Sequence, residues 1–219
     1  TRDLQVLASQ EMDTFSLAAA LAASTSEGVG AAGSVSLLDV DTTTRAYVAA
    51  ATLVAGGNVL IAADTGDDVF LLAVGGAYGA DAGVGLSNTT LLRTDTVEAF
   101  VDAGAGVTSR GAQGVSITAL SDEAILTISV GGAGSGDVAV AASAVVSDVT
   151  ENTAAYVSLG ATVQATNVSP TIEPSLAVRA FDNTRLLGIA GALSGAGSVA
   201  VGAGADVGLV TKRKIGRAS

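Results

Sequence analysis

The stretch Asp68-Val-Phe-Leu-Leu-Ala-Val-Gly-Gly76, an acidic residue followed by an apolar run and paired glycines, decides the fold because it recurs. Related stretches begin at Asp13, Glu123 and Asn183, so the successive intervals are 55, 55 and 60 residues. A fixed period of this length is typical of a repeat architecture, in which each unit buries its apolar face against the next. The chain therefore holds about four such units.

A second marker, the triplet Ala-aromatic-Val, has the same period. It is centred on Tyr47, Phe100 and Tyr156, at intervals of 53 and 56 residues. Two independent markers thus agree on one repeat. They divide the chain into units of residues 1–57, 58–113, 114–173 and 174–211, followed by a basic terminal segment at 212–219.

Apolar and polar residues alternate with period two inside a unit, which indicates strands. In residues 114–122 this pattern predicts that Val115, Ile117 and Ala119 face inward, while the serine and threonine between them face outward. The alanines of residues 17–23 favour a helix by intrinsic propensity. We reject that alternative because the equivalent positions of other units carry Val, Ile and paired glycines.

The composition favours a narrow interior. Apolar residues make up 49% of the 219 residues but aromatic residues only 3%, and there are 28 glycines and no tryptophan. Small side chains suit a core that is one or two side chains across. We therefore predict an all-β fold, a parallel β-helix or β-solenoid of about four imperfect repeats, each made of two to three coils of roughly 20 residues. Roughly 8 to 12 coils would make a rod on the order of 40 to 60 Å long.

Stacked units place the repeated aromatic residues in rows along the solenoid. We expect Phe15 to align with Phe70, and Tyr47 with Phe100 and Tyr156. Core filling is the expected role of these rings. The alternative is a platform on which sugars stack, which requires the rings to be exposed to solvent.

The net charge of −11, from 21 acidic and 10 basic residues, opposes binding to nucleic acid or to an anionic membrane. The uncharged residues 186–205 are long enough for a spanning helix, but they are rich in Gly and Ser and lack aromatic flanks. We therefore expect neither nucleic acid as a partner nor membrane insertion. Four basic residues gather near the end of an acidic chain, Lys212, Arg213, Lys214 and Arg217.

The chain contains no Cys and no His, which excludes thiolate metal sites and the usual nucleophilic triad. Calcium, which takes oxygen ligands, is then the structural ion to consider, with Asp64, Asp67 and Asp68 around Gly66 as its candidate ligands. A solvated turn is the alternative interpretation of these aspartates. Apart from this structural calcium, we expect no cofactor.

The pattern of Gly-Gly-rich apolar segments, Ala46-Tyr47-Val48 and strands such as Asn58-Val-Leu-Ile-Ala-Ala63 resembles the long imperfect repeats of large bacterial surface exoproteins. These are the haemagglutinin- and leukotoxin-like adhesins, and the likeness covers most of residues 4–210. It implies a β-helical shaft in an exported protein, located outside the cell or on the bacterial surface.

The expected function is a non-catalytic, extracellular structural rod or filament subunit that self-assembles through its solenoid ends. Lys212, Arg213, Lys214 and Arg217 are the candidate assembly residues, because a basic end can dock on the acidic body of another copy. A first alternative is an adhesin shaft or binding module that contacts a surface glycan or a host protein. A second is a polysaccharide-active β-helix enzyme that uses a pair of carboxylates. The chain begins at Thr1 without Met, so we expect a processed chain or a fragment.

Overall fold

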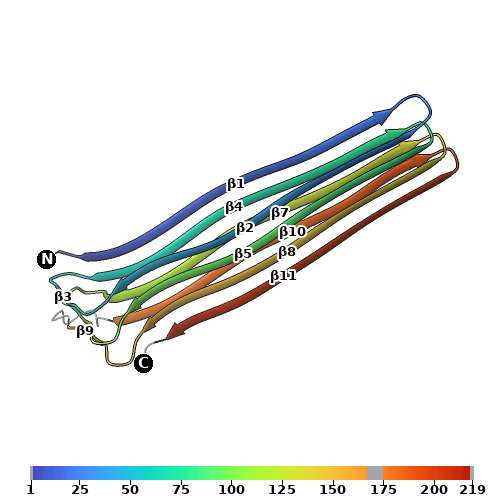
Figure 1. The fold of residues 1–219 in the computed structure, drawn as a ribbon. Coiled ribbons are helices and arrows are strands. Elements are labelled where there is room, and N and C mark those ends of the chain that lie inside the picture. Colours follow the sequence, from blue (N-terminus) through green and yellow to red (C-terminus); the bar gives the residue numbers. More distant parts are fainter. Residues whose placement is uncertain (1, 167–174, 218–219) are drawn as a thin grey trace.

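The computed structural model describes residues 2–166 and 175–217. Over these residues the chain forms strands in three parallel sheets and no helix, which confirms the predicted β-solenoid (Figure 1). The described part of the chain accordingly contains no helix long and apolar enough to cross a membrane. The first long sheet has the strand order β1 (Leu4–Ser24), β4 (Val59–Gly79), β7 (Gly114–Ser135), β10 (Ser175–Ala196). The second long sheet has the order β11 (Val199–Arg217), β8 (Val138–Val157), β5 (Ala82–Val101), β2 (Val29–Val48). The third sheet consists of short strands in the order β3 (Thr52–Ala55), β6 (Gly106–Ser109), β9 (Thr162–Ala165).

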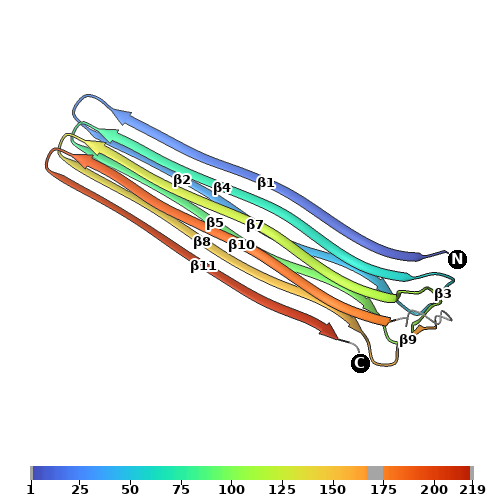
Figure 2. The same ribbon diagram turned by 180° about the vertical axis from the view of Figure 1, so that it is seen from behind.

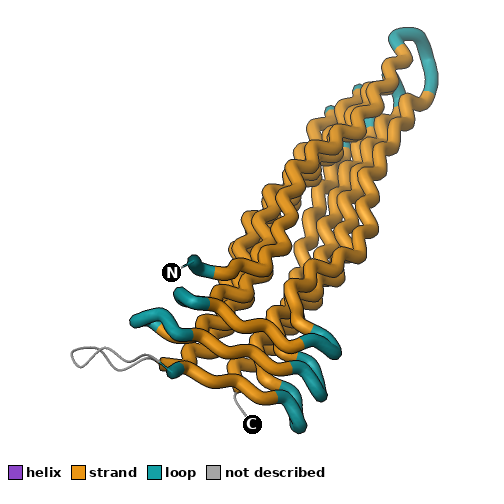
Figure 3. Tube along the Cα trace, turned by 90° about the vertical axis from the view of Figure 1, so that its left-hand side faces the viewer, coloured by secondary structure: helices purple, strands orange, loops and turns teal. Residues whose placement is uncertain are grey.

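Each coil runs out along a long strand of the first sheet and returns along a long strand of the second. The two long sheets face one another as two layers (Figure 3). In the first three coils a short strand of the third sheet then leads back to the next coil. These short strands and both chain termini lie at the same end of the molecule, as Figures 1 and 2 show from opposite sides.

One repeat forms one coil, and not the predicted two or three. Leu4, Val59, Val115 and Leu176 stand in register in successive strands of the first sheet, so each unit advances the stack by a single strand. A strand of 21 residues extends about 70 Å, whereas four stacked coils span only about 14 Å between the first and last strand. The molecule is therefore long in the direction of its strands, and the predicted long axis through many short coils is wrong.

The long strands continue through glycines at positions where a side chain would not fit. At the end away from the short strands, a Cβ on Gly75 would lie 1.8 Å from the carbonyl oxygen of Leu86, and a Cβ on Gly85 would lie 1.8 Å from that of Gly132. Only glycine fits where the backbones of the facing sheets approach so closely. Pro170 and Pro174 fall outside the described residues, so no described strand contains a proline to interrupt its ladder.

The register also corrects the alignment of the repeats. Tyr47, Phe100 and Tyr156 align as predicted, but the row of Asp13 and Asp68 continues through Ala124 and Arg185. Of the residues that the sequence alignment placed in this row, Glu123 belongs to the adjacent row and Asn183 to a row two positions away. A slip of one residue moves a side chain to the other face of a sheet, and Glu123 is accordingly buried, at 1% exposure.

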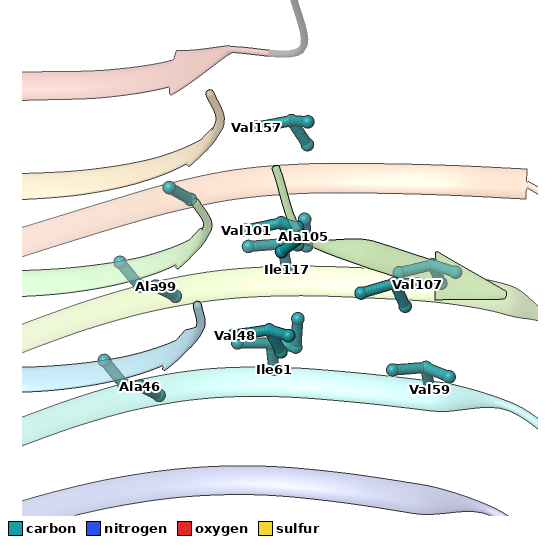
Figure 4. Close-up of a cluster of buried hydrophobic side chains, with 14 of the residues drawn as sticks. Ala46, Val48, Val59, Ile61, Ala99, Val101, Ala105, Val107, Ile117 and Val157 are labelled. Carbon is teal, nitrogen blue, oxygen red and sulfur yellow. The ribbon is translucent and has the colours of Figure 1, made fainter. Parts of the chain in front are cut away.

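The apolar core lies between the sheets at the end with the short strands (Figure 4). Val115, Ile117 and Ala119 are buried there as predicted, and they pack with residues such as Val59 and Val101 from neighbouring coils. A second, smaller apolar cluster lies further along the strands and includes Val69, Leu71, Leu91, Ile125 and Val149.

The aromatic residues form the predicted rows but do not fill the core. The rings of Phe15 and Phe70 stack with centroids 5.3 Å apart, and Phe100 stacks between Tyr47 and Tyr156 at 5.1 and 4.9 Å. Phe15 is 69% exposed and Tyr47 is 50% exposed, so both ladders lie on outer faces of the sheets. Core filling is therefore the wrong interpretation. Phe100 has a ring at each face, whereas Phe15 and Tyr47 in the first coil stack on one ring only.

Candidate functional site

The three aspartates predicted to bind calcium do not converge. Asp64 and Asp68 are exposed on the outer face of β4, whereas Asp67, in the same strand, points into the interior and is 3% exposed. Strand periodicity explains the split, because residues an odd number of positions apart face opposite sides of a sheet. The three carboxylates cannot share one ion in this arrangement.

Asp67 belongs instead to a buried charged layer between the two apolar clusters. One guanidinium nitrogen of Arg93, Nη2, donates to Asp67 and to Oε1 of Glu123 at 3.1 Å, and lies 3.4 Å from Oδ2 of Asp95. These four side chains are at most 1% exposed. The hydroxyl of Thr42 in the first coil also donates to Asp95, at 2.5 Å. The layer therefore connects strands of both long sheets.

The geometry of this cluster resembles a metal site, because oxygens of Asp67, Asp95 and Glu123 lie within 4.8 Å of one another. However, the guanidinium of Arg93 contacts all three carboxylates. It supplies the positive charge that an ion would supply, so the arrangement is that of an internal ion network.

The layer continues toward the last coil through Lys212. The ammonium Nζ of Lys212 lies 2.5 Å from Oδ1 of Asp182 and 3.3 Å from Oε2 of Glu151. The hydroxyl of Thr184 donates to Glu151 and accepts a hydrogen bond from Lys212 at 2.7 Å. Lys212 is one of the predicted assembly residues, but its charge is engaged inside its own chain.

The charged layer contains more acidic than basic side chains, and protonation of one acid reduces this excess of negative charge. Burial, reinforced by hydrogen bonds with Glu151 and Asp95, raises the pKa of Glu123 to about 10. Burial opposes the ionisation of Glu151, but hydrogen bonds with Glu123, Asp182 and Thr184 and the charge of Lys212 lower its pKa to about 2. At neutral pH these shifts favour a neutral Glu123 beside an ionised Glu151.

The Glu123–Glu151 pair combines a neutral carboxylic acid with a carboxylate, the chemical components of a glycosidase site. Each residue is 1% exposed, however, and both lie between the sheets. A polysaccharide has no access to them in this fold. We assign the pair to the stability of the solenoid.

The other three predicted assembly residues lie in β11. Residues 212–217 continue this strand, which pairs with β8 as far as Arg217 opposite Tyr156, so they are not a separate terminal segment. Lys214 lies over the ring of Phe181, with Nζ 5.8 Å from the centroid. Arg213 and Arg217 are exposed. The basic residues thus lie along one edge of the stack.

Both open edges of the stack are apolar, a feature that was not predicted from the sequence. β1 and β2 form one edge, and β10 and β11 form the other, and each pairs through one side only in the described chain. Exposed large apolar side chains concentrate on these four strands. They include Leu7, Leu17, Leu21, Val35 and Leu37 at the first edge and Leu187, Ile189, Leu193, Val207 and Leu209 at the last edge.

Comparison with known proteins gives no independent assignment, since no protein-family model, curated protein or solved structure matches the chain.

Proposed function

We propose that the protein is a non-catalytic structural element of the bacterial cell exterior that assembles end to end through the open edges of its solenoid. The observation that carries this proposal is the pair of unpaired edges. Each edge presents two strands of about 20 residues with backbone groups free to bond another strand. Strand addition to such an edge is a common mode of protein association.

The apolar side chains on the edge strands supply a driving force for this assembly. Leu21 is 83% exposed and Leu193 is 75% exposed, although both lie within long strands that pair with a neighbouring coil. Burial of apolar surface contributes roughly 25 cal/mol per Å², so a neighbour at either edge stabilises the coil that it covers. The extracellular location is supported by the resemblance to surface exoproteins and is part of the proposal.

Sedimentation velocity over a range of protein concentrations tests the proposal. We expect the unmodified protein to form larger species as its concentration rises. The double variant Leu17→Lys, Ile189→Lys places a charge at each edge and should remain monomeric. Leu159→Lys is the matched control, because Leu159 is 87% exposed in a turn and not in an edge strand, and this variant should assemble normally.

A strictly monomeric unmodified protein at high concentration would contradict the proposal. That result would favour the adhesin shaft, in which surface contacts and not self-association carry the function.

A further inference from the structure

The strands of each long sheet stack without slip, which restricts how a second copy can join. Along the first sheet Ile189 aligns with Ile128, Leu72 and Leu17. Along the second sheet Val207 aligns with Val146, Thr90 and Leu37. If a second copy continues this repeat, its first coil follows the last coil of its neighbour, and both long sheets continue across the junction.

In this continued register the side chains at the junction match in their apolar character. Leu17 of one copy meets Ile189 of the next, Leu21 meets Leu193, and Leu37 meets Val207. All six are exposed in the single chain. Neighbouring apolar residues in parallel strands bury one another's surface, so this register covers these six side chains together.

The charges at the junction match as well. Inside the chain Asp13 stands in register with Asp68, a like-charge neighbour that is unfavourable. At the opposite edge the same row ends in Arg185, which would stand beside Asp13 of the next copy. The aromatic row of Tyr47, Phe100 and Tyr156 ends in the same way at Arg217. Its guanidinium would then meet the free face of the next Tyr47 in a cation–π contact.

We infer that copies of this chain stack head to tail in the register of the repeat, with Arg185 of one copy beside Asp13 of the next. This inference rests on the proposed function and adds the polarity and register of the junction. Pairing of two like edges would be antiparallel, and it would break each of these matches. Heterologous contacts of this kind extend without closing, so they produce a polar filament.

Disulfide cross-linking tests the register, because the chain has no cysteine of its own. We would mix the single variants Leu37→Cys and Val207→Cys under oxidising conditions. The continued register places these positions about 4.8 Å apart, within the Cα separation that a disulfide spans, and a cross-linked heterodimer is expected. Val35→Cys with Val207→Cys is the control, because a shift of two residues puts the positions about 8 Å apart.

The outcomes separate the two proposals. If the protein assembles but Val207→Cys bridges to Val35→Cys as readily as to Leu37→Cys, the register is wrong and the proposed function stands. Efficient homodimers of Leu37→Cys alone would show that like edges pair and would overturn the polarity. An absence of both assembly and cross-links would overturn both proposals.

Charge reversal gives a second test. Arg185→Glu should weaken self-association about two- to fivefold, as expected for an exposed ion pair turned repulsive, and adding Asp13→Lys should restore it. Arg110→Glu, in an exposed turn away from both edges, is the control and should have no effect. Failure of the double variant to recover would contradict the Arg185–Asp13 pairing.

Discussion

The inner and outer coils have the same path and register but differ sharply in burial. Val149 in β8 is completely buried, whereas Val210, which stands in the same row of the adjacent β11, is 39% exposed. The difference shows that burial in this fold depends on a neighbouring coil on each side. An outer coil therefore has the side chains of an inner coil without the second neighbour that would bury them.

The coils differ in the same way in their interior charges. The second and third coils hold Arg93, Asp95, Glu123 and Glu151 inside, whereas Val40 and Thr42 of the first coil stand in the rows of Arg93 and Asp95. The first coil therefore lacks these charges, whereas the last coil adds Asp182 and Lys212 to the layer. Substitutions in the inner coils can show whether these coils depend on the pairing of these charges.

The largest effect is expected from Arg93→Met. The substitution leaves the buried carboxylates of Asp67 and Asp95 without their cation, and removal of one partner of a buried ion pair costs about 3–5 kcal/mol of unfolding free energy. Arg45→Met is the control, because Arg45 is 51% exposed and pairs with Glu98 at the surface, so the expected loss is below about 1 kcal/mol. Denaturant titration of both variants measures these losses. Equal effects would mean that the inner layer does not depend on its pairing.

A smaller loss is expected from Gly75→Ala at the narrow end of the sheets. The added methyl group would lie 1.8 Å from the carbonyl oxygen of Leu86, and such overpacking typically costs about 1–3 kcal/mol. Gly66→Ala is the matched control in the same strand, since no atom lies within 4 Å of its added Cβ. It should be neutral or stabilise by about 0.5–1 kcal/mol. Thermal unfolding distinguishes the two, and equal melting temperatures would contradict close approach of the sheets.

The dependence of stability on pH should also have an unusual direction. The pKa of Glu123 is raised from 4.5 in the unfolded reference to about 10, so its contribution favours the folded state at low pH and falls as the pH rises between these values. The pKa of Glu151 is lowered to about 2, so its contribution is lost as the pH falls from about 4.5 to 2.

Together these two shifts predict greatest stability in mild acid, with a decline toward alkaline pH. Glu123→Gln removes the first titration and should flatten the alkaline decline. Denaturant midpoints measured from pH 3 to 10 check this, and an unchanged decline in the variant would assign it to other groups.

The smallest effect concerns the aromatic ladder of the second sheet. Phe100 stacks on a ring at each face, whereas Tyr47 stacks on one. Since a ring pair contributes about 0.5–1.5 kcal/mol, Phe100→Leu should lower the unfolding free energy by about twice as much as Tyr47→Leu. If both cost the same in denaturant titrations, the inner and outer positions of the ladder would be energetically equivalent.

The fold class could be predicted from the sequence because period-two alternation and the repeat are local signals. The row of Tyr47, Phe100 and Tyr156 was placed correctly, since each aromatic residue has the same two neighbours. The number of coils could not be predicted in this way. Gly75 and Gly85 look like turn residues in the sequence, but they act through close contact with a facing strand that lies in another sheet.

The charged layer was missed for a related reason. The sequence alignment placed Glu123 beside Asp68, one position away from the row of Asp67 to which it belongs. Asp67 and Asp95 are 28 positions apart, and nothing in their local sequence indicates that Arg93 brings them together with Glu123. An alignment in which the inward-facing positions coincide in all units would have placed Asp67, Asp95 and Glu123 on the inner face.

Electron microscopy of the concentrated protein with image averaging tests end-to-end assembly most directly. We expect filaments with strands about 4.8 Å apart along the axis and a rise of about 19 Å per subunit, which is four strand spacings. Isolated particles with four stacked coils and both edges uncovered at every concentration would contradict it.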